Sequence, residues 1–236
     1  MRQTDPVPPP ATLVIFGASG ATGRAAVLDA AARGYRVRAI DHSGGESWPE
    51  GVEEIVADVL EDDLRDIVRG GDAVLSCLGV GNDLATLASP PPLYTKGTGR
   101  IAEAMAAEGV ERLVVISASF VATRDRGPLL FRLGAEPALA RVFAQMAEME
   151  EMLAGTRLAW TAVRPGWLME GPATGDVLIR EDEIASDTIR TRHADLAAFM
   201  LDCVASGDWA RATPAISRPE APEHESNAAV AEAMLA

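Results

Sequence analysis

The residues of this chain best suited to chemistry are three glycines that follow a short apolar run. Leu13–Phe16 is typical of a strand, and Gly17, Gly20 and Gly23 form a tight turn before a helix-forming segment. Glycines at this spacing let backbone N–H groups and the positive end of a helix approach a pyrophosphate without obstruction. Because a strand precedes the turn and a helix follows it, phosphate binding is the better interpretation. A tight strand–helix turn without a ligand is the alternative.

Small residues between the glycines keep this turn open. We therefore predict that the whole turn binds a dinucleotide through its phosphates, with an arginine at its end. The predicted cofactor-binding residues of the turn are Gly17, Ala18, Ser19, Gly20, Ala21, Thr22, Gly23 and Arg24.

Asp41 closes the second predicted strand, residues 37–40. A carboxylate at this place commonly accepts hydrogen bonds from the adenosine ribose and disfavours a 2′-phosphate. Three neighbouring cations, Arg24, Arg38 and His42, can offset the charge of such a phosphate. These residues alone therefore leave the choice between NAD and NADP open. A solvated turn residue is the alternative for Asp41.

Two further strand ends are predicted to line the same ligand, because the carboxyl ends of parallel strands share one edge of a sheet. Asp58 and Val59 follow the third predicted strand, residues 52–57, where a carboxylate can accept a bond from adenine. Capping of the next helix is the alternative for Asp58. Leu78 and Gly79 follow the fourth strand with little side-chain bulk, and a plain loop is the alternative there.

Two hydroxyls and two aromatic rings mark where a reacting group would lie. Ser117 and Ser119 follow the fifth predicted strand, and either can supply a proton. Bonding to the nicotinamide region or capping of the strand end is the alternative. Phe120 and Trp167 are predicted to form an apolar platform for a planar substrate, with Pro165 as backbone beside the nicotinamide. A packed loop residue is the alternative for Trp167.

Strand-like and helical segments alternate along the chain, which predicts right-handed crossovers and a parallel sheet covered on both faces. The expected fold class is α/β, a Rossmann-like doubly wound sheet with a small C-terminal region on the substrate side. The predicted strands are residues 13–16, 37–40, 52–57, 73–78, 113–117 and 158–163, and the predicted helices are 25–33, 62–69, 97–108 and 136–154.

The NAD(P)-binding domain is predicted to span residues 12–217, with a tail at each end. Residues 1–11 are polar and rich in proline, which predicts a disordered N-terminal tail. Residues 218–236 begin with prolines and acidic residues. They end in an alanine-rich stretch, 228–236, which can form a short helix but lacks the bulk to anchor one.

Composition excludes several functional classes. Asp and Glu total 35 against 21 Lys and Arg, a net charge of −14, which repels nucleic acids and anionic membrane surfaces. No apolar stretch approaches the roughly 18 residues needed to span a bilayer. The spacing of Cys77 and Cys203, and of His193 and His224, indicates neither a metal site nor a disulfide framework. We therefore expect a cytoplasmic protein that binds neither nucleic acid nor membrane.

Together these motifs resemble those of atypical short-chain dehydrogenase/reductase families. The nearest likeness is to biliverdin-IXβ reductase/flavin reductase, and more broadly to nitrogen-repression-regulator-like NAD(P)-binding proteins. The resemblance covers residues 12–217 and implies a cofactor, NADP or NAD with NADP slightly favoured, and a small-molecule acceptor. Besides the glycine turn, the segments that carry it are 57–59, 72–74, 81–84, 109–114, 161–166 and 195–203.

The chain departs from this pattern in two places. The related reductases have an arginine after the second strand and a histidine near the substrate, where this chain has His42 and Trp167. A serine expected after the fifth strand falls at Ala118, between Ser117 and Ser119. The resemblance therefore does not supply a general acid.

Ordinary short-chain dehydrogenases use a tyrosine and a lysine four residues later. Neither Tyr35 nor Tyr94 has a lysine at that offset, and Lys96 is the only lysine in the chain. Alcohol dehydrogenation, and an epimerase or dehydratase reaction, are therefore disfavoured. Hydride transfer to a flavin or quinone needs no such pair, because the proton can come from water or a neighbouring hydroxyl. We predict an NAD(P)H-dependent reductase, with a non-catalytic redox-sensing regulator as the rival.

The acidic balance also predicts indifference to nucleic acid. In a gel-shift assay at about 0.15 M salt, where the Debye length is about 8 Å, the protein should not retard duplex DNA. A robust shift would contradict this expectation and revive the regulator in a DNA-binding form.

Overall fold

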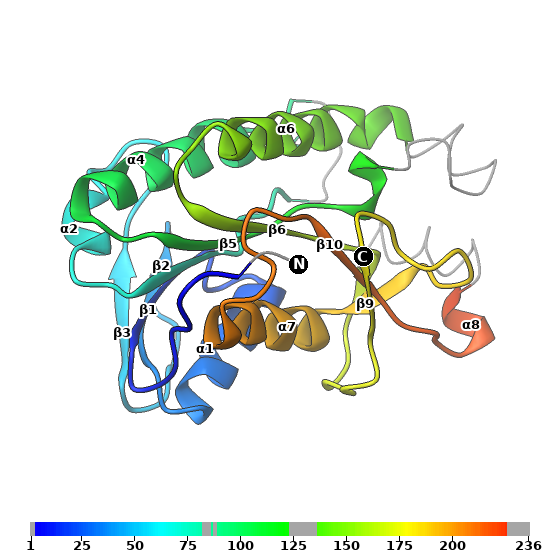
Figure 1. Cartoon of the computed structure of the whole chain (residues 1–236), viewed down its shortest axis with the longest axis horizontal. Coiled ribbons are helices and arrows are strands. Elements are labelled where there is room, and N and C mark those ends of the chain that lie inside the picture. Colours follow the sequence, from blue (N-terminus) through cyan, green and yellow to red (C-terminus); the bar gives the residue numbers. More distant parts are fainter. Residues whose placement is uncertain (1–2, 82–85, 87–88, 123–135, 226–236) are drawn as a thin grey trace.

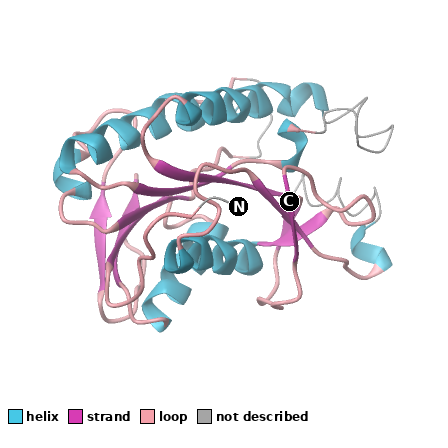
Figure 2. Ribbon diagram, in the orientation of Figure 1, coloured by secondary structure: helices cyan, strands magenta, loops and turns pink. Residues whose placement is uncertain are grey.

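The computed structural model of the chain describes residues 3–81, 86, 89–122 and 136–225. These residues form three layers, with a twisted sheet between two layers of helices (Figure 1). Coloured by secondary structure, the strands cross the middle of the molecule and helices cover both faces (Figure 2).

The main sheet has eight strands in the doubly wound order, which reverses direction beside the first strand. All its pairings are parallel except the last one, and a second, two-stranded parallel sheet lies beside it. This arrangement confirms the predicted fold class. In sheet order the strands are β3 (Val52–Val56), β2 (Arg36–Asp41), β1 (Thr12–Phe16), β4 (Ala73–Ser76), β5 (Arg112–Ile116), β6 (Ala159–Pro165), β10 (Pro214–Ser217) and β8 (Leu178–Glu181), and the small sheet pairs β7 (Trp167–Met169) with β9 (Arg190–Arg192).

One face of the sheet carries α1 (Ala21–Ala32) and α7 (His193–Ser206), and the other carries α2 (Arg65–Val68), α4 (Thr98–Glu108) and α6 (Glu136–Ala154) (Figure 1). The described part of the chain also holds three shorter elements: a π-helical turn η1 (Leu93–Gly97), a 3-10 turn η2 (Ser119–Val121) and α8 (Pro222–Glu225). No helix within the described ranges is long and apolar enough to cross a membrane.

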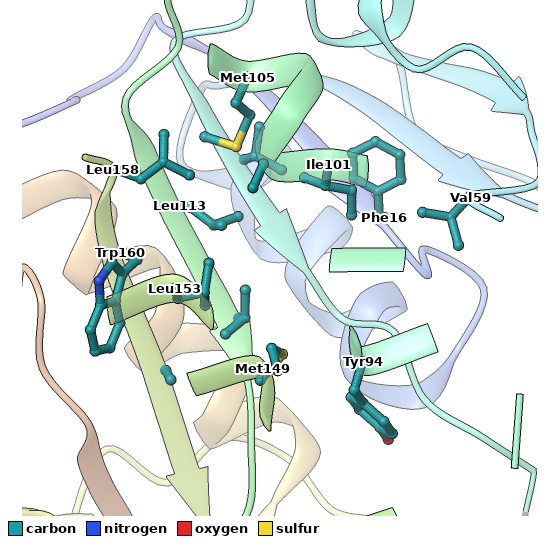
Figure 3. Close-up of a cluster of buried hydrophobic side chains, with 14 of the residues drawn as sticks. Phe16, Val59, Tyr94, Ile101, Met105, Leu113, Met149, Leu153, Leu158 and Trp160 are labelled. Atoms are coloured by element: carbon teal, nitrogen blue, oxygen red, sulfur yellow. The ribbon is translucent and has the colours of Figure 1, made fainter. Parts of the chain in front are cut away.

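Every residue of β1 is buried, and its side chains alternate between the cores on the two faces of the sheet. Leu13 and Ile15 belong to the core under α1 and α7, whereas Val14 and Phe16 belong to the core under α4 and α6. Successive side chains of a strand point to opposite faces, so a strand covered on both sides must be apolar throughout. Figure 3 shows the second core, in which Phe16 lies with side chains of α4, α6 and neighbouring strands.

The structure corrects the predicted helix over residues 62–69, since α2 begins only at Arg65. The Asp58 carboxylate accepts the N–H of Leu60 at 2.8 Å, and the Asp62 carboxylate accepts the N–H of Asp58 at 2.7 Å. Acidic side chains that bond nearby backbone compete with a helix in this way. No helix or strand was predicted beyond residue 163, but α7 and β7 to β10 lie there.

Residues 3–11 differ from the predicted disordered tail. The N–H groups of Thr4 and Val7 donate to the carbonyls of Gly207 and Val204, at 2.9 and 3.1 Å. The Tyr35 hydroxyl donates to the Val7 carbonyl at 2.9 Å. These bonds hold the segment against the end of α7, where its prolines need no sheet partner.

The start of the predicted C-terminal tail is also tied to the domain. Arg192 bonds Glu220 at 2.7 Å, and Arg218 bonds Asp176 at 3.0 Å. The alanine-rich stretch 228–236 lies outside the described residues.

Candidate functional site

The glycine turn joins β1 to α1 at the carboxyl edge of the sheet. Gly17 has φ +72°, and a Cβ there would lie 2.6 Å from the carbonyl oxygen of Cys77. A Cβ at Gly23 would overlap the carbonyl oxygen of Gly17. Gly20 differs, since its Cβ would meet only the Gly17 carbonyl oxygen, at an ordinary 3.5 Å. Two glycines of the motif thus serve close packing, and the third faces open space.

Helix α1 begins after Gly20 without a side-chain cap. The N–H groups of its first turn, residues 21–23, therefore lack intrahelical acceptors and carry the positive end of the helix dipole. Beside them, the open Cβ position of Gly20 leaves room for an anion. These residues fit the pyrophosphate of a dinucleotide.

Asp41 holds the turn in place from the end of β2. Its Oδ2 accepts the N–H and the hydroxyl of Ser19, at 3.0 and 2.7 Å. The exposed His42 ring lies 2.7 Å from its Oδ1. Burial by itself would raise the pKa of Asp41, but the bonds from Ser19, together with the neighbouring His42, outweigh it and lower the pKa. Both oxygens of Asp41 are thus engaged, and a ribose hydroxyl would have to displace the His42 ring.

Two of the three cations that could offset a 2′-phosphate are committed elsewhere. Arg24 pairs with Glu46 and lies over the Trp48 ring, 5.3 Å from its centroid. Arg38 donates to the carbonyls of Ile67 and Arg69, both at 2.8 Å, at the end of α2. In this structure Arg24, Arg38 and His42 therefore contact other protein groups and do not converge on one site for a 2′-phosphate.

The third and fourth strand ends meet as expected, with different roles for their residues. Asp58 is exposed and bonds its own turn, which favours the capping alternative. Val59 is buried, and both Val59 and Leu78 lie within 3.4 Å of where a Cβ at Gly97 would be. Gly79 has open space on its Cβ side. Backbone at residue 79 thus stays accessible, while Val59 and Leu78 pack against Gly97.

A buried carboxylate that the sequence analysis missed organises the ends of β5 and β6. Ser117 donates its hydroxyl to Oε1 of Glu150 at 2.6 Å. Arg164 bonds both oxygens of Glu150, at 3.0 and 2.6 Å. Ser117 is 1% exposed and the Arg164 side chain 11% exposed. The hydroxyl proton of Ser117 therefore points to Glu150, which makes Ser117 a structural support. Ser119, which is also buried, stays the predicted proton source.

The sequence offered one signal for Glu150: at helical spacing it falls on the same face as Met146, Met149 and Leu153, although other glutamates flank it. That signal alone does not separate a buried ion-pair member from a solvated residue. Its partners Ser117 and Arg164 lie 33 and 14 positions away, the first just after β5 and the second on β6.

The structure brings the predicted aromatic pair together. The rings of Phe120 and Trp167 have centroids 4.9 Å apart, and Phe143 of α6 stacks on Phe120 at 5.4 Å. Trp167 is half-buried, and its backbone N–H donates to the Ile189 carbonyl at 2.7 Å. Pro165, the last residue of β6, is buried beneath this segment. An aromatic surface therefore lies at the carboxyl ends of β5 and β6.

His193, which the sequence analysis left without a role, contacts the glycine turn. Its Nδ1 lies 2.7 Å from the Thr22 hydroxyl oxygen. Burial lowers the pKa of His193, and the Glu170 carboxylate offsets part of this effect. The first residue of α7 thus links the turn to the segment after Trp167.

The described residues offer neither a metal site nor a reactive thiol. Within those ranges, no three His, Cys, Asp or Glu side chains gather where they could hold an ion. Burial raises the pKa of Cys77 to about 12, so this thiol next to the site stays protonated.

Residues 17–207 match the model of the NAD(P)H-binding family. The chain belongs to this family. This confirms the predicted binding of NAD(P) and the likeness to atypical short-chain dehydrogenases/reductases, without deciding between NAD and NADP.

Solved structures share the fold at low identity. The oxidoreductase ylbE from Lactococcus lactis has a TM-score of 0.73 at 19% identity, covering 95% of each chain. A candidate NADH-flavin reductase from Streptococcus pneumoniae has a TM-score of 0.70 at 23% identity, covering 89% of this chain and 100% of that one. A short-chain dehydrogenase/reductase from Veillonella parvula has a TM-score of 0.69 at 14% identity, covering 89% and 94%.

We expect Gly20→Val to abolish binding of NADH and NADPH while the protein stays folded. The backbone at Gly20, φ −65° and ψ 158°, suits any residue, and the branched side chain would fill the space that a pyrophosphate enters. Calorimetric titration measures the affinity, and thermal unfolding the stability. Gly23→Val should instead unfold, because its Cβ overlaps backbone. A folded Gly20→Val protein with normal affinity would place the phosphates elsewhere.

Glu150→Gln should lower the free energy of unfolding by about 3 kcal/mol, because it removes the carboxylate that bonds Arg164 twice and leaves only the more exposed Asp182, 3.6 Å away. Urea unfolding measures the change. Glu151→Gln is the matched control, since Glu151 is exposed and should change stability by no more than about 0.5 kcal/mol. Equal losses in the two variants would show that Arg164 does not depend on Glu150.

Proposed function

We propose that this chain is a reductase that passes hydride from NAD(P)H to a planar acceptor such as a flavin or quinone. The observation that carries the proposal is the aromatic surface of Phe120 and Trp167, whose ring centroids lie 4.9 Å apart. Trp167 is half-buried, and the buried Phe120 ring packs against it at an interplanar angle of 49°. The Trp167 ring is therefore the apolar face on which a conjugated ring can stack. When bound, the reduced nicotinamide supplies the hydride.

The position of this surface in the sheet supports the same reaction. A dinucleotide lies across the carboxyl edge of a doubly wound sheet, with its pyrophosphate at the first turn. The strand order β2-β1-β4-β5-β6 puts Asp41 on one side of that turn and the aromatic pair on the other. If the adenosine lies toward β2, the nicotinamide end reaches toward β5 and β6, beside Phe120 and Trp167.

The polar groups near this surface favour an acceptor that needs no tailored acid. Ser117 directs its hydroxyl to Glu150, and burial raises the pKa of Tyr94 to about 12. A simple carbonyl needs a positioned proton donor, whereas a reduced flavin or quinone takes its proton from water. The hydride then brings two electrons to the acceptor, and the solvent proton balances the charge.

The same contacts favour one rival, a redox-sensing regulator that binds the dinucleotide without turnover. Such a protein needs no proton donor, so the bond from Ser117 to Glu150 and the raised pKa of the buried Tyr94 fit it equally. Only turnover separates the two.

The proposal predicts oxidation of NADH or NADPH with at least one acceptor from a panel of flavins and quinones. Trp167→Ala should lower kcat/KM for that acceptor roughly fivefold, the worth of one aromatic stacking contact, while cofactor affinity stays unchanged. Trp167→Phe keeps a flat ring and should retain most of the activity. Tight cofactor binding without turnover on any acceptor would favour the regulator.

A further inference from the structure

The first part of the loop between β2 and β3, residues 42–48, is folded around a single carboxylate. Glu54 of β3 accepts the backbone N–H groups of Gly45 and Glu46, at 3.1 and 3.0 Å. The indole N–H of Trp48 also donates to it, at 3.3 Å. Glu54 belongs to the edge strand of the sheet, and its own side chain is exposed.

Three N–H donors that converge on one point form an anion site. Consecutive backbone N–H groups in a turn bind carboxylates and phosphates alike, and charge makes such bonds shorter and stronger. Here the anion is part of the protein. The N–H groups of Gly45 and Glu46 lower the pKa of Glu54, so its carboxylate stays ionised at neutral pH.

The loop also lies too close to β3 to admit a further group between them. A Cβ at Gly44 would come within 2.7 Å of Val56 Cγ2 and 3.4 Å of Glu54 Oε2. A phosphate could therefore reach the loop donors only by displacing the Glu54 carboxylate.

This loop directly follows Asp41, where the ribose of a bound dinucleotide carries its 2′ substituent. The cations of this corner are already neutralised by carboxylates. Arg24 pairs with Glu46, and the His42 ring lies against Asp41. With Glu54, three carboxylates thus face a single permanent cation, and a 2′-phosphate would add to the repulsion.

We propose that Glu54 is a specificity-determining residue, whose carboxylate occupies the anion site that the 2′-phosphate of NADP would need, so that the chain selects NAD. Arg24 is one of the cations that could offset the charge of a 2′-phosphate, and its carboxylate partner Glu46 already offsets its own charge. The inference uses the NAD(P)H-binding character of the family and does not depend on the acceptor.

The test compares binding of NADH and NADPH to the wild-type protein and to Glu54→Gln by calorimetric titration. Wild type should bind NADH at least tenfold more tightly. Glu54→Gln should shift the ratio of the two affinities about tenfold toward NADPH and leave NADH within twofold. The shift should shrink as salt rises, because the side chain is exposed.

Glu53→Gln is the matched control. Glu53 is the preceding residue of β3, is 67% exposed, and lies 3.6 Å from Arg38 without bonding the loop. Glu53→Gln removes the same charge and should change the ratio of the NADH and NADPH affinities less than twofold. Adenosine 2′,5′-bisphosphate and 5′-AMP serve as probes of the adenosine end alone, and Glu54→Gln should improve only the former.

Each of three results would overturn the proposal. They are a wild-type preference for NADPH, an equal fall in both affinities in Glu54→Gln, and an equal shift in Glu53→Gln. All are binding measurements, so they stand whether or not any flavin or quinone is reduced. Failure of the reductase proposal would appear separately, as absent turnover.

Discussion

The close approach of α1 to the end of β1 is the constraint on which the rest of the site depends. Gly17 and Gly23 lie so near each other and the Cys77 carbonyl that neither has room for a Cβ. This contact directs the positive end of α1 to the carboxyl edge of the sheet. It also sets the position of α7, which packs along α1 and contacts the turn through His193 and Thr22.

Around this fixed turn, carboxylates hold the loops. Asp41 bonds the turn, Glu54 gathers the loop after β2, and Glu150 joins the ends of β5 and β6. Asp195, at the start of α7, accepts the N–H groups of Thr174 and Gly175, at 2.7 and 3.2 Å. In a chain with net charge −14, many of the acidic groups near the site are thus already bonded. The N-terminus of α1 is then the place prepared for an external anion.

The adenosine side and the acceptor side of the edge therefore differ in character. The first is lined by carboxylates with engaged donors, and the second carries the half-buried Trp167 ring, packed on the buried rings of Phe120 and Phe143. Under the two proposals, charge selects the cofactor on the first side, and the Trp167 ring binds the acceptor on the second. A cofactor lying between them would be held chiefly by its pyrophosphate, whose position backbone geometry sets.

By itself, the sequence determined the features that depend on neighbours in the chain. Glycine spacing predicted the turn, apolar runs predicted β1 to β6, and the strand ends predicted that Phe120 and Trp167 would meet. Only the tertiary structure decided which polar groups pair across the chain. Ser117 with Glu150, Arg24 with Glu46, and residues 3–11 with the end of α7 are such pairs. Periodicity reports whether a position is buried, whereas the partner of a buried or folded-over polar group depends on how distant elements pack.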